Sequence, residues 1–283
     1  MTLSHSLAKA TAPSPTIIAP RRPVWARLIN VWHYRELLYF LAWRDIKVRY
    51  KQTLLGAAWA ILQPLAMMLV FSLFFGRLAH LPSERLPYPV FYYAALVPWT
   101  YFATVVTNST ESLVSHQTVI TRVYFPRVLL PMSTAVAGLV DLGLAFLTLV
   151  GLVAIYGFTP SLRFFWLIPL FALALLTAFT AGLWLSAFNA MYRDVRYMVP
   201  FLVQFWLFAS PIAYSSSMVP KSWRAIYGLN PIAGIVEGFR WSLTGSGLAP
   251  GPMLAASAGT VLLLLALGLW YFQRSETTIV DRV

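Results

Sequence analysis

The sequence contains no cysteine and little charge. With no cysteine in 283 residues, a disulfide framework, a thiol nucleophile and a cysteine metal cluster are all excluded. Charged residues make up 11% of the chain, against about 25% in an ordinary soluble domain, and only nine are acidic. The net charge is +12, yet the bases form no dense stripe of the kind that binds nucleic acid. These absences argue against a soluble domain and against a nucleic-acid partner.

Several catalytic motifs are also missing from the sequence. No G-x-x-x-x-G-K-[ST] phosphate loop occurs, so the chain has no recognisable means of hydrolysing ATP itself. The four histidines are scattered, without an H-E-x-x-H motif, and neither a metal site nor a cofactor is predicted in this chain. No internal repeat supports an inverted-repeat secondary transporter. Active transport by this protein would need an energy source elsewhere.

What the sequence does contain is a series of long apolar runs. Hydrophobic residues make up 59% of the chain, aromatic residues 16%, and the mean hydropathy is +0.69. Six stretches carry at most one charge each and are long enough to cross a bilayer. They are residues 54–76, 90–110, 128–158, 164–192, 197–220 and 251–273. The sequence therefore predicts an all-α polytopic membrane protein, with six transmembrane helices in a domain spanning 52–273.

Lysine and arginine in the connections predict the orientation of these spans. Positive residues are retained on the cytoplasmic side of a membrane. With both termini inside, the inner segments carry fifteen bases and the outer connections five. Residues 1–31, which contain four prolines and no continuous apolar run, are expected to be a flexible cytoplasmic tail rather than a signal peptide. Residues 274–283 are expected to be a second cytoplasmic tail.

Residues 32–51 have the pattern of an amphipathic interfacial helix. Aromatic and aliphatic side chains share one helical face, whereas basic side chains occupy other faces. A helix of this kind lies in the membrane interface, where tryptophan and tyrosine suit the headgroup layer. A surface helix packed on its own bundle is the alternative, and the two readings are compatible. The face consists of Trp32, Tyr39, Trp43, Ile46 and Tyr50, and the bases are Arg44, Lys47 and Lys51.

The segment 215–250, between the fifth and sixth spans, is predicted to contain two short helices. Asn230 and Pro231 have the character of an N-cap and a first helical residue, and Gly245 that of a helix stop. A helix over 231–244 is too short to cross a membrane. With a preceding helix at 220–228, it is expected to be re-entrant or to cover the outer mouth of a pore.

Two spans contain polar residues that need an interpretation. Asp141 lies well inside the third span, where a carboxylate is either functional or hydrogen-bonded to a neighbouring helix. The second span has a hydroxyl-rich stripe that ends in a carboxylate, which fits either a wet pathway or contacts between helices. The stripe consists of Thr100, Thr104, Thr107 and Glu111.

Other faces are small or aromatic. In the fourth span Ala178, Gly182, Ser186 and Ala190 recur every four residues, which is typical of close helix packing. Aromatic rings are abundant in the second and fifth spans, where they either form the interfacial belt or offer flat surfaces to the C–H faces of sugars. The candidate channel residues are Tyr93, Thr100, Thr104, Thr107, Glu111, Phe201, Phe205 and Phe208.

Several short motifs follow one another along the six-span map. They are the run from Arg44 to Gly56, Gln63-Pro64, Tyr124-Phe125-Pro126-Arg127, Arg193-Asp194, Ser210-Pro211 and Asn230-Pro231. Taken in this order, they resemble the permease subunits of ABC transporters that export polysaccharides. No single motif is specific, but their order is, and the resemblance covers residues 33–272.

This resemblance implies a homodimer of permeases in the bacterial inner membrane, bound to two copies of a cytoplasmic ABC ATPase that carries ATP and Mg. The substrate would be a glycan linked to a lipid diphosphate. The cytoplasmic loop 113–127 would dock on the ATPase as a coupling helix, through an apolar-aromatic anchor between two bases. These docking residues are Arg122, Val123, Tyr124, Phe125, Pro126 and Arg127.

The same resemblance places a substrate entrance beside the interfacial helix and a periplasmic gate in the outer helices. Basic side chains at the entrance would attract a diphosphate, with arginine as a bidentate partner. Anionic membrane lipid would be attracted by the same charges. The entrance residues are Arg44, Lys47, Arg49 and Lys51, and the gate residues are Asn230, Pro231, Glu237 and Arg240.

Other functions are compatible with six spans. An ABC permease for drugs or lipids would share the arrangement, and a membrane scaffold would need no special residues. A membrane-embedded glycosyl or acyl transferase would need a cluster of histidines or carboxylates, which the sequence lacks. The residues do not distinguish O-antigen, capsule and teichoic acid as the exported glycan.

Overall fold

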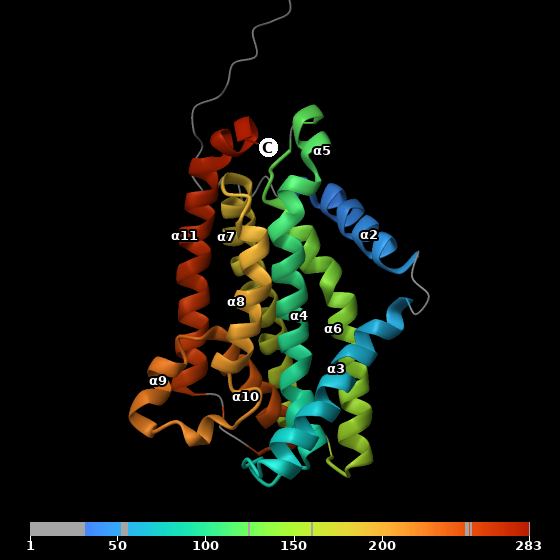
Figure 1. The fold of residues 1–283 in the computed structure, drawn as a ribbon, viewed down its shortest axis with the longest axis vertical. Coiled ribbons are helices and arrows are strands. Elements are labelled where there is room, and N and C mark those ends of the chain that lie inside the picture. The colour runs from blue at the N-terminus through green and yellow to red at the C-terminus, as the bar shows by residue number, and fades with distance from the viewer. Residues whose placement is uncertain are drawn as a thin grey trace, which may run out of the picture.

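All regular secondary structure in the described part of the chain is helical (Figure 1). The structure, a computed structural model, describes residues 32–51, 56–123, 125–159, 161–246, 249 and 251–282. Within these ranges, the side chains of 121, 122, 221, 225 and 276–282 are not described. The expected N-terminal tail, 1–31, lies outside the described residues.

Five helical segments are long and apolar enough to cross a membrane, and they confirm five of the six predicted spans. Each begins and ends within five residues of its prediction, because hydropathy alone marks such segments. The first joins η1 (Gly56–Ala58), α3 (Trp59–Phe71) and the π-helical η2 (Ser72–Leu78). The others are α4 (Tyr88–Ser115), α6 (Leu129–Ile155), η3 (Leu162–Trp166) with α7 (Leu167–Met191), and the first 24 residues of α11 (Pro252–Arg282).

The predicted fifth span, 197–220, is wrong in its extent. Helix α8 (Val195–Ala209) has only 15 residues and is about 22 Å long, whereas a span needs about 20 residues. The helix ends because Ser210 has extended backbone (φ −104°, ψ 154°) and Pro211, which follows, lacks an amide hydrogen. Helix α11 continues through residues 274–282, so the described part of the expected C-terminal tail is helical.

Helix α4 runs through the centre of the bundle and packs on α6, α7 and α10. Its closest approach to α7 is at Gly182, where an added Cβ would lie 2.6 Å from the Cβ of Ser109. On α6, a Cβ at Gly138 would lie 2.7 Å from Val105. The small side chains Ala178, Ser186 and Ala190 are buried on the same face of α7. Small residues therefore bring the three central helices into close contact.

The bundle has two chemically different ends (Figure 1). At one end lie α5 (Gln117–Arg122), the start of α2 (Arg35–Lys51) and the end of α11; we call it the α5 end. The opposite end, called the α10 end, holds η4 (Ser216–Met218), η5 (Lys221–Trp223), α9 (Arg224–Tyr227) and α10 (Pro231–Thr244). Both described ends of the chain therefore lie at the α5 end.

The capping residues predicted for α10 are confirmed. The Asn230 side chain accepts a hydrogen bond from the Ile232 amide, Pro231 is the first helical residue, and Gly245 ends the helix at φ 72°. An asparagine N-cap, a proline at the first position and a left-handed C-terminal glycine together define a helix by local sequence alone. For this reason the observed bounds, Pro231–Thr244, match the predicted 231–244.

Candidate functional site

The α10 end contains a fully buried ion pair. The Arg240 side chain has no exposed surface, and its Nη1 donates to Glu237 Oε1 at 3.0 Å. The other guanidinium hydrogen bonds go to main-chain carbonyls, at 3.2 Å to Phe91, 2.7 Å to Pro211 and 3.1 Å to Ile212. Because these acceptors belong to α4 and to the chain after α8, Arg240 fastens three parts of the protein together.

Asn230 provides a second connection at the same end. Its Oδ1 accepts from Trp206 Nε1 at 2.9 Å, and its Nδ2 donates to Ser210 Oγ at 2.9 Å. Nearby, the Tyr227 hydroxyl is within 2.8 Å of the Tyr214 hydroxyl and 3.2 Å of the Ala209 carbonyl. Burial and the bond to Tyr214 raise the pKa of Tyr227, so its phenol stays protonated. Three of the four predicted gate residues, Asn230, Glu237 and Arg240, thus tie α10 to neighbouring segments, and Pro231 is its first helical residue.

Glu84 also belongs to this network, although no sequence pattern predicted it. The Glu84 carboxylate accepts a hydrogen bond from the Ser215 hydroxyl, while the Ser216 amide donates to Glu237 Oε1 at 3.3 Å. Glu84 and the next residue, Arg85, both have positive φ, at 54° and 68°. Two consecutive left-handed residues are uncommon outside glycine, and such strain needs support from surrounding contacts. A hydropathy pattern carries no sign of this conformation.

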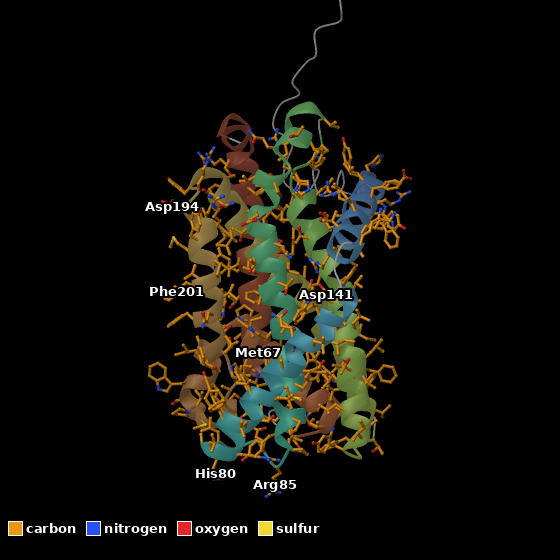
Figure 2. The ribbon with its side chains drawn as sticks, turned by 45° about the vertical axis from the view of Figure 1, so that its right-hand side comes forward. Met67, His80, Arg85, Asp141, Asp194 and Phe201 are labelled. Atoms are coloured by element: carbon orange, nitrogen blue, oxygen red, sulfur yellow. The ribbon has the colours of Figure 1, made fainter. Side chains whose placement is uncertain are left out.

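At mid-height in the bundle, Asp141 is in contact with the end of α2. Its carboxylate is bonded to the guanidinium of Arg49 and to the hydroxyl of Tyr50. Asp141 is twelve residues into α6, or about 18 Å along it, and Figure 2 shows it at mid-height in the bundle. Helix α2 therefore runs obliquely to a level deep in the bundle. Of the two interpretations of Asp141, the contact between helices is the one with observed partners.

The opposite face of α2 is exposed and aromatic. Trp32, Tyr39 and Trp43 are exposed, whereas Leu41 and Ala42 are buried. The rings of Tyr39 and Trp43 are stacked, with centroids 6.4 Å apart. The helix is thus packed on the bundle through one face and presents rings on the other, but the predicted aromatic face is divided, because Tyr50 is half-buried and bonded to Asp141 on α6.

The four predicted entrance bases have different surroundings. Arg44 lies between Asp45, at 2.8 Å from Nη2 to Oδ1, and the ring of His116. Arg49 is engaged by Asp141, whereas Lys47 and Lys51 are exposed. Among the four predicted entrance residues, the two lysines are therefore the more accessible positive charges. His116 joins α4 to α5, so its contact with Arg44 also ties α2 to the start of α5.

The predicted docking residues are divided between core and surface. Phe125 is only 4% exposed and packs with Leu41 and Leu113, so it holds the loop to the bundle. Val123 is 56% exposed, while Pro126 and Arg127 are half-buried. Tyr124 and the side chain of Arg122 lie outside the described part of the chain. Among the described side chains of the loop 113–127, the exposed apolar ones are Val114, Val119 and Val123.

The polar stripe of α4 lies on the accessible part of an otherwise buried helix. Thr100, Thr104 and Thr107 are half-buried and Glu111 is exposed, although most of α4 is covered by neighbouring helices. Thr100 and Thr107 each donate to a carbonyl of the preceding turn. Because neither hydroxyl is bonded to another helix, the observed geometry favours an open polar face over contacts between helices. Tyr93, also predicted for the channel, has no exposed surface and belongs to the core.

Helix α8 presents aromatic rings away from the bundle. Phe201 is 71% exposed, and Phe205 and Phe208 are also exposed on the same face. Figure 2 shows Phe201 pointing outward at the edge of the molecule. The three predicted rings are therefore accessible on the surface of one chain. Within the described ranges, no three His, Cys, Asp or Glu side chains come together as ligands for a metal ion.

These features define a multi-pass membrane protein that has an open polar stripe on its central helix. The chain belongs to the ABC-2 type transporter family, which it matches over residues 36–244. This match spans the bundle from the start of α2 to the end of α10. It confirms, at the level of the family, the resemblance carried by the sequence motifs.

Individual relatives extend over most of the chain. It is 30% identical over 259 residues to the O-antigen export system permease protein RfbA of Myxococcus xanthus, which covers 88% of this chain and 97% of that protein. An RfbA of Klebsiella pneumoniae is 30% identical over 216 residues, covering 75% and 81% of the two chains. The polysialic acid transport protein KpsM of Escherichia coli is 23% identical over 244 residues, covering 82% and 91%.

Proposed function

We propose that this chain is the membrane-spanning permease subunit of an ATP-driven exporter, which moves a polysaccharide linked to a lipid diphosphate from the cytoplasm to the periplasm. The observation that carries the proposal is the similarity to O-antigen export permeases along nearly the full length of one of them. Two copies of the chain would work with two copies of a cytoplasmic ABC ATPase that binds ATP and Mg. The complex would lie in the bacterial inner membrane.

In this proposal, the α5 end faces the cytoplasm. The positive-inside rule supports this orientation, since the segments at that end carry most of the lysines and arginines. Helix α8, fifth in chain order, would add a sixth crossing to the five spans, because it carries the chain from the α5 end towards the α10 end (Figure 1). The irregular turn after Ala209 would complete that crossing against protein rather than lipid, as the buried Ser210 and Ile212 allow. Six crossings leave both termini in the cytoplasm.

The glycan path would lie where two copies face each other. The threonine face of α4 would exchange hydrogen bonds with sugar hydroxyls, and the exposed rings of α8 would contact sugar C–H faces. Both sets of contacts are weak and repeated, which suits a polymer that has to slide. Lys47 and Lys51 would attract the lipid diphosphate at the cytoplasmic entrance. At the periplasmic end, α10 and its buried network would form the gate.

Force would enter through α5. ATP binding would close the ATPase dimer and move the segment that contains Val119 and Val123. That movement has a route to α2, because His116 at the start of α5 contacts Arg44. Helix α2 in turn contacts α6 through Asp141, so the entrance would respond to the ATPase. The two nucleotide states would be distinguished by different contacts at this surface.

The proposal is tested by Val123→Asp in cells that also express the partner ATPase. A charge at the centre of an apolar contact is expected to abolish ATPase co-purification and glycan export, because it would be buried without a partner. Leu162→Asp is the control, since Leu162 is also exposed (85%, against 56% for Val123) but lies in η3, which packs on α10 at the opposite end. Persistence of both activities in the Val123 variant contradicts docking at this surface. Stimulation of the ATPase by drugs or free lipid, but by no lipid-linked glycan, would favour the alternative drug or lipid permease.

A further inference from the structure

His116 lies where α4 ends and α5 begins, and its ring contacts both α4 and α2. The ring Nδ1 is 2.7 Å from the main-chain carbonyl oxygen of Ser112, one turn earlier on α4. The ring Nε2 is bonded to Nη2 of Arg44, which lies on α2 and is 72 positions away in the sequence. In the proposed function, this bond is the point at which movement of α5 reaches the substrate entrance.

The two partners of the ring determine its protonation state. A carbonyl oxygen only accepts hydrogen bonds, so Nδ1 has to carry the hydrogen that it donates to Ser112. A guanidinium only donates, so Nε2 has to offer the lone pair that accepts from Arg44. Both contacts are satisfied by the neutral imidazole with its hydrogen on Nδ1. His116 therefore links α5 to α2 in its uncharged form.

A proton on Nε2 would break this link. Two N–H groups would then face each other, and the positive charges of the imidazolium and the guanidinium would repel. Arg44 would keep a partner, since its Nε and Nη2 donate to Asp45 Oδ1 at 3.3 Å and 2.8 Å. The imidazolium would keep its bond to the Ser112 carbonyl. Protonation would therefore remove one contact and leave both side chains with a partner, as a reversible switch requires.

The charged groups to consider around the ring lie on α2, on α4 and after α5. On α2, Asp45 is bonded to Arg44 and also accepts from the Ser133 hydroxyl of α6 at 3.3 Å. The nearest described charged side chains along the sequence are Glu111, exposed on α4, and Arg127, half-buried after α5. Among these described groups, Arg44 is the one bonded to the ring. A change in the charge of the ring would therefore act first on α2.

Apolar contacts also hold α2 on the bundle, and they do not depend on pH. Leu41 of α2 belongs to one buried cluster with Leu113 of α4 and Ile120 of α5. Because aliphatic side chains have no protonation state, this cluster would persist when the polar link breaks. Loss of the bond between His116 and Arg44 would therefore loosen the position of α2 without detaching the helix.

We propose that His116 is a protonation-controlled link, which fixes α2 relative to α5 only while its imidazole is neutral. Histidine suits this role, because it is the side chain that ordinarily changes its charge between about pH 5 and pH 8. The inference rests on the proposed function, since it adds control by pH to the route from the ATPase to the substrate entrance. Acidification on the side of α5 would uncouple the two helices, and a return to higher pH would join them again.

The test uses the full chain in nanodiscs, without any ATPase, and spin labels at Phe40→Cys on α2 and Val119→Cys on α5. Both positions are exposed, and the chain has no cysteine of its own. We expect a narrow distance distribution at about pH 8 and a broad one at about pH 5.5, on either side of the ordinary pKa of histidine. Because one proton controls the contact, the ratio of the narrow to the broad component should change about tenfold per pH unit.

Two substitutions of His116 separate its charge from its presence. His116→Gln offers an amide oxygen that accepts from Arg44 and does not titrate, so the distribution should stay narrow at both pH values. His116→Lys is charged and cannot accept, so the distribution should be broad at both. Arg44→Met removes the donor, should also give a broad distribution at both pH values, and replaces His116→Lys if that variant fails to fold.

Two results would overturn the inference. One is a distribution that is equally narrow at both pH values in the otherwise unchanged protein, and the other is a pH response that persists in His116→Gln. Since no ATPase is present, either result leaves the proposed function standing. A pH-dependent position of α2 in a chain that supports no ATP-driven export would instead refute the proposed function and leave the link.

Discussion

Two ion pairs hold the bundle together in different ways. At the α10 end, Arg240 is fully buried and has four hydrogen-bond acceptors, three of them main-chain carbonyls. At mid-height, where α2 ends, Arg49 and Asp141 keep 26% and 19% of their side-chain surface exposed, and they join α2 to the bundle through side chains alone. A pair tied into the backbone of several segments cannot separate without unfolding them. A pair between two side chains can separate while both helices persist, so we expect the position of α2 to be more adjustable than the α10 end.

The largest effect is expected from Arg240→Met. It leaves the Glu237 carboxylate buried and unpaired, and removal of one partner of a buried pair costs about 3–5 kcal/mol. We expect a steep loss of thermal stability, measured by size-exclusion chromatography after heating in detergent. Arg85→Met, at an exposed position of the same end, should change little. Equal stability of the two variants would mean that the buried Arg240 pair contributes no more to stability than an exposed arginine at the same end.

The Arg240 result is sharpened by a double variant. Adding Glu237→Met removes the unpaired charge, so part of the lost stability should return, because apolar replacements of buried pairs are often tolerated. Recovery should be incomplete, since the carbonyls of Phe91, Pro211 and Ile212 still lack their donor. Full recovery would show that the carbonyl bonds contribute nothing.

A smaller effect is expected from Gly182→Ala, which tests whether the core between the two ends is rigid. The added methyl would lie 2.6 Å from the Cβ of Ser109, so α4 and α7 must separate, at a cost of about 1–3 kcal/mol. Gly143→Ala is the matched control, because nothing lies within 4 Å of its added Cβ. Alanine favours a helix over glycine by up to about 1 kcal/mol, so the control should be slightly stabilised. The close packing is supported if the melting temperature falls in the Gly182 variant and rises in the Gly143 variant. It is contradicted if both melting temperatures change in the same direction.

The smallest effect on stability is expected from Asp141→Ala, about 1–2 kcal/mol, with a larger effect on the position of α2. Because the chain has no cysteine, spin labels at Val48→Cys and Val140→Cys report only the distance between α2 and α6. We expect a narrow distance distribution with Asp141 and a broad one without it. Glu111→Gln, which removes an exposed carboxylate of α4, should leave the distribution narrow. A narrow distribution in both variants would mean that other contacts position α2.

Much of the fold could be predicted from local patterns in the sequence. Hydropathy located five spans, and the caps Asn230 and Gly245 fixed the bounds of α10. The end of α8 was not predicted, because the apolar run continues past Pro211 and membrane helices tolerate proline. In the structure, the extended conformation of Ser210 ends the helix first. In an apolar run, a proline inside a membrane helix cannot be told from a proline that follows the end of one.

The candidate site was harder to predict, since its contacts join residues that are distant in sequence. Asp141 meets partners 91 and 92 positions away, and Arg240 reaches Phe91 across 149 positions. A charged residue in an apolar chain is recognisable from the sequence, but the residue that it contacts is not. Phe125 shows the opposite difficulty, because an aromatic residue between bases fits a docking anchor and a core contact equally well. Its burial distinguishes the two in favour of the core.

The central claim is that this chain conducts a substrate but depends on a separate ATPase for energy. The most direct measurement is transport of a lipid-linked glycan into sealed proteoliposomes that contain the purified permease, with and without its partner ATPase. The account predicts ATP-dependent accumulation only when both proteins are present, and none when Val123→Asp replaces the unchanged permease. Directional accumulation by the permease alone would contradict it.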